Sequence, residues 1–200
     1  MKKVLVGLLL LLAVVALAIE VVAPQLAEAR IEEHVQARTE GAVGVSADVG
    51  TFPVVTRLLA TERLPRLAVT LDEVAGQQLT FTSVRFELRG VSLDRDALLA
   101  GNVRVRGMQS GHVTVTADAA ALQEAIGAPV RLEGGSVIAD VAGRQVQLPL
   151  ALEGGALRLP GGLPTLALPD VVPCTTADTA VLDGRIELSC ALEEVPLILT

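Results

Sequence analysis

The sequence is poor in aromatic and in basic side chains. Among its 200 residues there is no tryptophan, no tyrosine and only three phenylalanines. Lys2 and Lys3 are its two lysines, and after them 14 arginines stand against 23 acidic side chains. Binding of nucleic acid needs a basic stripe and commonly uses aromatic rings as stacking platforms. The composition therefore argues against nucleic acid as a partner.

Side chains suited to catalysis are also scarce. The two histidines, His34 and His112, lie far apart in sequence without a neighbouring nucleophile or metal ligand, so we expect surface or structural roles for them. Asp94 and Asp96 resemble the Asp-x-Asp pair of glycosyltransferases, but they stand at an expected helix start, where acidic groups cap. No nucleophile elbow, Walker loop or dinucleotide fingerprint is present. We expect no enzyme, no metal and no cofactor, and an envelope enzyme using Asp94 and Asp96 is the alternative.

The chain has two cysteines, Cys174 and Cys190, both near its C-terminal end. In an oxidising compartment the simplest interpretation is one disulfide, which in the chain-entropy model contributes on the order of 3 kcal/mol. The alternative is a pair of buried free thiols.

The beginning of the chain has the features of an export signal. Lys2 and Lys3 precede an unbroken apolar run over residues 4–19, which are the charged and apolar parts of a secretory signal. As a helix this run is about 24 Å long, against a hydrocarbon core of about 30 Å. Ala16 and Ala18 offer a cleavage site, whereas apolar residues after Glu20 could extend the run into an anchor.

We therefore expect residues 1–19 to be a signal peptide or a membrane anchor. Residues 20–200 are long enough for one domain with a substantial core, and we expect a single domain there. The expected location is the cell envelope or periplasmic space, with the protein either secreted or anchored.

Hydrophobic periodicity predicts one helix followed by many strands. Residues 24–40 repeat apolar side chains every four positions, as in an amphipathic helix, with Glu28, Glu32 and Glu33 on its other faces. Short helices are expected at 94–100 and at 118–127. The apolar positions change parity between Phe81 and Val84, which suggests a bulge near Thr82 and Ser83 that would bend the sheet. The expected strands are 45–49, 67–71, 79–88, 103–106, 112–116, 130–132, 136–141, 145–152, 156–159, 180–188 and 195–199.

The predicted fold class is therefore α+β, with an N-terminal amphipathic helix packed on a large, strongly curved antiparallel sheet and short extra helices. Hydrophobic residues make up 51% of the chain, mostly as aliphatic side chains. Two interpretations remain open. The strands either enclose a packed aliphatic core or line an apolar groove that an acyl chain fills.

The order of these segments resembles that of a known family. Gly50, Phe52 and Pro53 lead into an apolar turn at residues 54–59, after the export segment and helix and before strands with a Pro-rich late connection. This arrangement resembles the LmeA-like family of actinobacterial envelope proteins over most of residues 20–200. Family members are described as phospholipid-binding proteins with a half-barrel fold similar to the tubular lipid-binding proteins.

The resemblance implies a non-catalytic phospholipid-binding protein that carries lipid or supports assembly of envelope lipids or lipoglycans. The alternative is a structural or interaction protein of the envelope without a lipid ligand. The implied partners are a phospholipid, anionic ones included, and the membrane surface. Arg57, Arg63 and Arg66 are candidates for holding a headgroup phosphate, because arginine forks match its oxygens; ordinary surface charge is the alternative. The candidate groove residues are Phe52, Pro53, Val54, Leu58, Leu59, Phe81 and Phe86.

Overall fold

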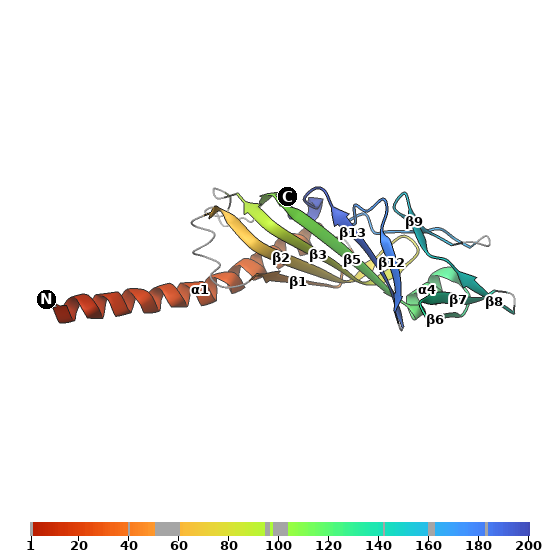
Figure 1. Ribbon diagram of the computed structural model, residues 1–200, viewed down its shortest axis with the longest axis horizontal. Helices are drawn as coiled ribbons and strands as arrows, with labels where there is room; N and C mark the ends of the chain where they lie inside the picture. The colour runs from red at the N-terminus through yellow and green to blue at the C-terminus, as the bar shows by residue number, and fades with distance from the viewer. Residues whose placement is uncertain are drawn as a thin grey trace.

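The computed structural model describes residues 2–39, 41–50, 61–94, 97, 104–141, 143–159, 163–182 and 184–200. One long helix leads into an elongated body built on three antiparallel sheets (Figure 1). The elements are α1 (Lys2–Arg38), β1 (Gly44–Val49), β2 (Arg63–Ala75), β3 (Thr80–Leu93), β4 (Val105–Gly107), β5 (Ser110–Asp118), α4 (Ala119–Ile126), β6 (Val130–Glu133), β7 (Ser136–Val141), β8 (Arg144–Leu148), β9 (Ala151–Glu153), β10 (Ala156–Arg158), β11 (Leu166–Ala167), β12 (Asp178–Leu182), β13 (Arg185–Leu192) and the 3₁₀ turn η1 (Leu197–Leu199).

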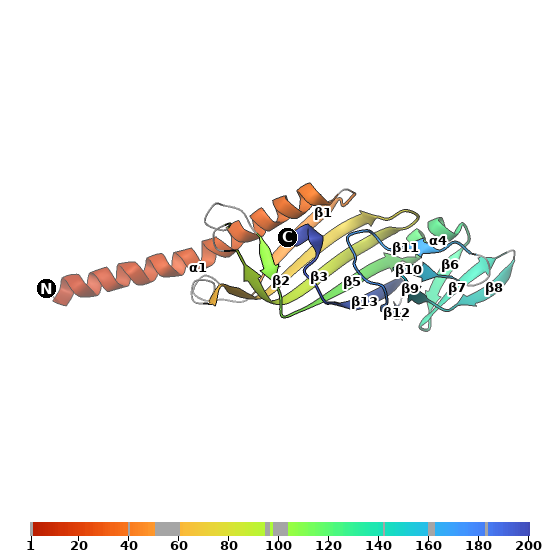
Figure 2. The same ribbon diagram turned by 90° about the horizontal axis from the view of Figure 1, so that it is seen from above.

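The large sheet has seven strands in the order β1-β2-β3-β5-β13-β12, with β4 paired to β3. Two three-stranded sheets, β6-β7-β8 and β11-β10-β9, lie at the end of the body far from the N-terminus (Figures 1 and 2). The α+β class and the helix packed on a large antiparallel sheet are thus confirmed. The large sheet is not strongly curled, so the strong curvature expected from the sequence was wrong.

The sheet lacks this curvature because β2 and β3 switch together which alternate side chains face the core. The bulge expected near Thr82 and Ser83 would add one residue to one strand and bend the sheet there. Instead, the pairing keeps one register on both sides of this point: Leu71 with Val84, and Val74 with Phe81. All four of those side chains are buried, so both strands change parity together, at Glu73 on β2 with a φ of 48°. No residue is inserted, and the bend that an insertion would cause is absent.

Helix α1 lies along one edge of the large sheet and accepts hydrogen bonds from its edge strand, β1. Within β1, the edge strand, the N–H of Ala47 donates to Glu32 Oε1 at 2.9 Å and the N–H of Val49 donates to Glu28 Oε1 at 3.0 Å. Four residues of helix rise about 6 Å, and two residues of strand span nearly 7 Å, so the two carboxylates match alternate edge N–H groups. The sequence pattern placed Glu28 and Glu32 on polar faces but did not reveal this role.

The export segment and the amphipathic helix form one continuous helix through Pro24. Its first half projects from the body, and its second half lies along β1 (Figure 2). In the described part of the chain, no helix combines the length and the hydropathy that crossing a membrane requires. The large apolar side chains exposed on α1 lie between residues 10 and 26: Leu10, Leu11, Val14, Val15, Leu17, Val21, Val22 and Leu26.

The inner face of the large sheet is buried. Phe86, Leu88 and Val113 on its central strands have no exposed side-chain surface. Three groups of segments cover this face: the second half of α1, the chain around η1, and the small sheet β9–β11 with the connection after it (Figure 2). The buried side chains of these segments include Ile31, Val35, Leu152, Leu157, Leu166, Leu168, Val172, Ile198 and Leu199.

Several predicted elements are confirmed and others are corrected. Helix α4 begins where Asp118 Oδ1 accepts the N–H of Ala121 at 2.8 Å, and ends at Gly127 with a φ of 73°, as expected. The strand expected at 145–152 is two strands, because Pro149 cannot donate to a ladder. The strand expected at 180–188 is likewise interrupted by a turn at Gly184, with a φ of 82°. Residues 195–199 are not a strand: Pro196 precedes the 3₁₀ turn. The expected helix at 94–100 falls mostly outside the described residues.

Removing the Glu28 or Glu32 carboxylate should destabilise the protein. We expect Glu28→Ala and Glu32→Ala each to lower the free energy of unfolding by about 1–2 kcal/mol, because a partly buried edge N–H loses its acceptor. Urea unfolding followed by circular dichroism measures this. Glu33→Ala is the control, because Glu33 makes an exposed ion pair with Arg30 at 3.1 Å and should cost less than about 0.5 kcal/mol. Equal losses in all three variants would contradict the edge role.

The disulfide between Cys174 and Cys190 gives a second expectation. Its two cysteines are 16 positions apart, so the chain-entropy model gives a stabilisation of about 3 kcal/mol. The double variant Cys174→Ala/Cys190→Ala should lower the unfolding free energy by roughly that amount. Wild-type protein unfolded in excess dithiothreitol should match the variant. A variant as stable as the oxidised wild type would show that the disulfide does not stabilise the fold.

Candidate functional site

The structure confirms the predicted disulfide. Cys174, in the connection after β11, is bonded to Cys190 on β13, and their Cα atoms are 6.2 Å apart. Disulfides persist in oxidising compartments and are rare in the cytosol. The bridge therefore indicates an extracytoplasmic protein.

The predicted groove residues fall into two groups. Phe52, Pro53, Val54, Leu58 and Leu59 lie outside the described residues, as does Arg57. Phe81 and Phe86 lie on β3 and are fully buried in the core of the large sheet. Over the described residues the inner face is closed.

Arg63 and Arg66 lie on the opposite, outer face of the sheet. Leu64 and Leu67 are both buried, so β2 changes parity between them, at Pro65. The partner strand does the same at Gly90, which has a φ of 60° and lies so close to Gln109 that a Cβ atom would come within 2.5 Å of it. Arg63 and Arg66 therefore share the outer face although they are three residues apart. The structure does not bring these arginines together with Phe81 and Phe86.

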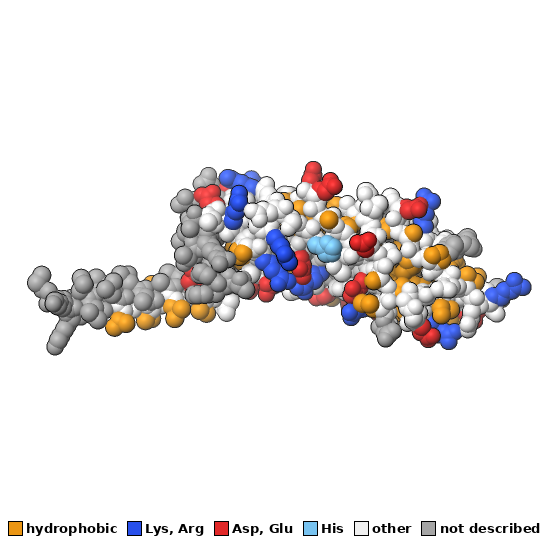
Figure 3. Space-filling view, viewed as in Figure 1, with side chains coloured by type: hydrophobic (Ala, Val, Ile, Leu, Met, Phe, Trp, Pro, Cys, Tyr) orange, Lys and Arg blue, Asp and Glu red, His pale blue; other side chains and the backbone are white. Residues whose placement is uncertain are grey.

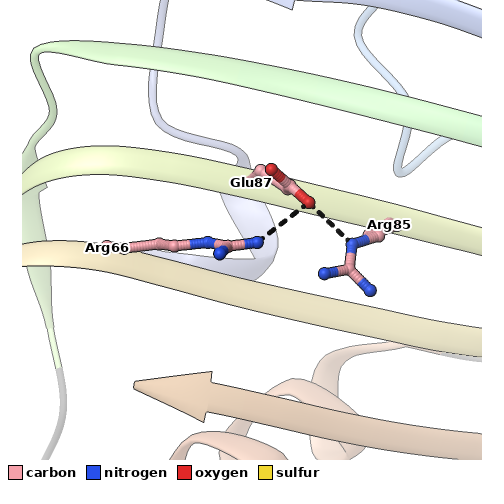
Figure 4. Close-up of polar contacts among 3 residues, drawn as sticks. All are labelled: Arg66, Arg85 and Glu87. Carbon is pink, nitrogen blue, oxygen red and sulfur yellow. Dashed lines mark hydrogen bonds and ion pairs between the residues drawn. The ribbon is translucent and has the colours of Figure 1, made fainter. Parts of the chain in front are cut away.

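The outer face is polar, with arginines, carboxylates and a histidine over β2, β3 and β5 (Figure 3). At its centre, Glu87 Oε1 accepts hydrogen bonds from Arg85 Nε at 2.9 Å and from Arg66 Nη2 at 3.2 Å (Figure 4). The hydrogen bond from Arg85 is the main cause that lowers the pKa of Glu87, and partial burial opposes it. Two guanidinium groups thus share one carboxylate, and Arg66 already has a partner.

Two shallow polar pockets meet on this face at Arg85. One, of about 370 Å³, is bounded by Ser46 and Asp48 on β1, by Arg66 and Thr70 on β2, and by Arg85. The other, of about 740 Å³, extends toward β13. Its lining consists of hydroxyl groups and charged side chains with one glycine: Thr82, Ser83, Arg85, Thr114, Thr116, Asp118, Gly184, Arg185 and Glu187. Neither pocket offers the apolar wall that an acyl chain requires.

A third pocket, of about 650 Å³, lies beside the disulfide, between residues 170–176 and residues 190–198. Sequence reasoning did not find it, although both cysteines and Pro173, at the end of the Pro-rich connection, line it. Eight of its lining residues have aliphatic side chains: Val171, Pro173, Ala191, Leu192, Val195, Pro196, Leu197 and Ile198.

The remaining candidates for chemistry have structural contacts. Asp94 accepts a hydrogen bond from the N–H of Ala97 at 3.1 Å, as a helix cap does, and pairs with Arg106 at 2.9 Å. Asp96 lies outside the described residues. Burial is the main cause that lowers the pKa of His34, Arg38 adds to it, and a hydrogen bond with the Thr200 backbone opposes it. Within the described residues, no three potential metal-ligating side chains gather.

Comparison with known proteins gives one match that covers most of the chain. The model of the LmeA-like phospholipid-binding family matches residues 19–196. No curated protein and no solved structure matches the chain. Because the family match covers far more than half of the sequence, the chain belongs to the LmeA-like phospholipid-binding family.

Proposed function

We propose that this protein is a non-catalytic, extracytoplasmic phospholipid-binding protein that carries lipid or supports the assembly of envelope lipids or lipoglycans. The observation that carries the proposal is membership of the LmeA-like phospholipid-binding family over residues 19–196. The disulfide supports the extracytoplasmic part of it. The family is a binding family, which supports a role without catalysis.

The affinity would come from the acyl chains. Each methylene moved from water to an apolar wall contributes about 0.8 kcal/mol. The inner face of the large sheet has the required apolar surface, including Phe81 and Phe86. Because this face is closed in the described structure, we propose that lipid binding requires one of its covering segments to move.

The headgroup would meet arginine at the start of β2. Arg63 is exposed on the outer face, whereas Arg66 is hydrogen-bonded to Glu87. An anionic headgroup at Arg66 would have to compete with that carboxylate. Of the two described candidates, Arg63 is therefore the better phosphate ligand.

We also propose that residues 1–19 act as an export signal or as a membrane anchor. Helix α1 runs without a break from Lys2 to Arg38 and bonds β1 through Glu28 and Glu32. If the first part of the helix stays in the membrane, the helix connects the bilayer directly to the sheet. If it is removed, the domain is free to move through the envelope.

A second function is favoured by one observation. The closed inner face is what a structural or interaction protein without a lipid ligand would have, because such a protein needs a filled core. This alternative predicts a protein partner and no bound lipid. The two functions therefore differ in whether the natively purified protein contains bound phospholipid.

Native mass spectrometry of detergent-free protein separates them. We expect mass added by one phospholipid to part of the population, and uptake of more phospholipid after incubation with vesicles. A lipid-free protein such as lysozyme, carried through the same purification, controls for adventitious lipid. Apo mass alone, with no uptake from vesicles, would remove the phospholipid-binding proposal and leave the scaffold.

A further inference from the structure

The pocket beside the disulfide differs from the two outer pockets because it is continuous with the core. Cys174, Leu192 and Ile198 belong both to its wall and to the buried cluster under the large sheet. Its volume of about 650 Å³ lies in the range of roughly 300–1,000 Å³ that is typical of small-molecule sites. An apolar ligand that entered here would reach the inner face without crossing the polar outer face.

The two walls of this pocket are held in different ways. Residues 170–176 contain Cys174, whose bond to Cys190 fixes that wall covalently to β13. The other wall includes residues 195–198. Together with Leu199 and Thr200 they are here called the closing segment. Three of its hydrogen bonds are internal. The Leu199 N–H donates to the Pro196 carbonyl at 2.9 Å, and the N–H and Oγ1 of Thr200 donate to the Leu197 carbonyl at 3.4 and 3.0 Å. A three-residue 3₁₀ turn has poor hydrogen-bond geometry, so it gives this wall little rigidity of its own.

The closing segment contacts α1 at Thr200. Arg38 Nη1 donates a hydrogen bond to the carbonyl oxygen of Thr200, and His34 lies against the same residue. Inside the body, Ile198 and Leu199 are buried, whereas Leu197 is 84% exposed. Two aliphatic side chains and a polar contact with α1 therefore keep this wall in place.

An acyl chain could take the place of the Ile198 and Leu199 side chains in the core. It offers the same aliphatic surface, and cores accept exchange of one apolar group for another when volume is conserved. Polar groups at the mouth also bear on the ligand. Asp170, Glu193 and Glu194 line the pocket, and its lining includes no lysine or arginine among the described residues. Such a mouth repels an anionic headgroup and suits one with an ammonium group.

We propose that this pocket admits an acyl chain of a zwitterionic phospholipid, and that the closing segment is the wall that moves aside to let the chain reach the inner sheet face. The inference rests on the proposed phospholipid binding. It adds the place of entry and the moving part, and it assigns the headgroup to the acidic mouth of this pocket in place of Arg63.

Photo-crosslinking tests the place of entry. Full-length protein is incubated with vesicles of phosphatidylcholine that carries a diazirine near the ester end of one acyl chain, the part expected to stay in the pocket. The sample is then irradiated, digested and mapped by mass spectrometry. Adducts are expected in residues 170–176 and 190–198. Bound lipid with adducts confined to other segments would overturn this inference and leave the proposed function intact. No bound lipid and no adduct would overturn both.

Two arginine variants on the same helix test the moving wall. Arg38→Gln removes the hydrogen bond to Thr200, so the rate of phosphatidylcholine uptake from vesicles should rise by roughly three- to tenfold. Arg30→Gln removes the same charge from an exposed ion pair with Glu33 and should leave the rate at the wild-type value. Circular dichroism checks that both variants are folded. An Arg38→Gln rate equal to or below that of Arg30→Gln would contradict a wall that opens.

Headgroup preference is measured on the same full-length protein. Uptake from phosphatidylcholine or phosphatidylethanolamine vesicles should exceed uptake from phosphatidylglycerol vesicles at equal ionic strength. Glu193→Gln/Glu194→Gln should narrow that preference, because two of the three mouth carboxylates are gone. A preference for phosphatidylglycerol in the wild type would contradict the assignment of the headgroup class, whatever the site of the adducts.

Discussion

The architecture of the large sheet depends on the hydrogen bonds that helix α1 makes to its edge strand, β1. Glu28 and Glu32 supply acceptors to alternate N–H groups of β1, so a helix occupies the edge where another strand could pair. A sheet sealed in this way does not close on itself as a barrel does, and its apolar face has to be covered by other parts of the chain. The second half of α1, the closing segment and the small sheet β9–β11 provide that cover.

A bound lipid must offset the free-energy cost of displacing part of this cover. Moving Ile198 and Leu199 out of the core would cost about 1.5–3 kcal/mol for each side chain. At about 0.8 kcal/mol per methylene, roughly four to eight buried methylenes offset that cost, and common membrane acyl chains are longer than this. A closed inner face is therefore compatible with lipid binding when one wall is held weakly. The disulfide between Cys174 and Cys190 keeps the opposite wall in place.

Local sequence signals predicted much of the fold, whereas contacts between distant segments were not visible in them. The disulfide, the Asp118 cap of α4 and most strands follow from neighbouring residues or from strand periodicity. The parity change at Phe81 and Val84 was visible, but the matching change on β2 that cancels a bulge requires the pairing. In the same way, the roles of Glu28 and Glu32 depend on β1, and the pocket depends on segments that only the folded chain brings together.

The central claim is that the apolar face is a lipid-binding surface that the closing segment covers until lipid arrives. Amide hydrogen exchange of the full chain, with and without bound phosphatidylcholine, tests it most directly. The account predicts faster exchange at Leu199, whose N–H bonds the Pro196 carbonyl, and unchanged protection in the central strands β2 and β3. Bound lipid that leaves residues 195–200 unchanged and protects the outer face around Arg66 and Arg85 would contradict it.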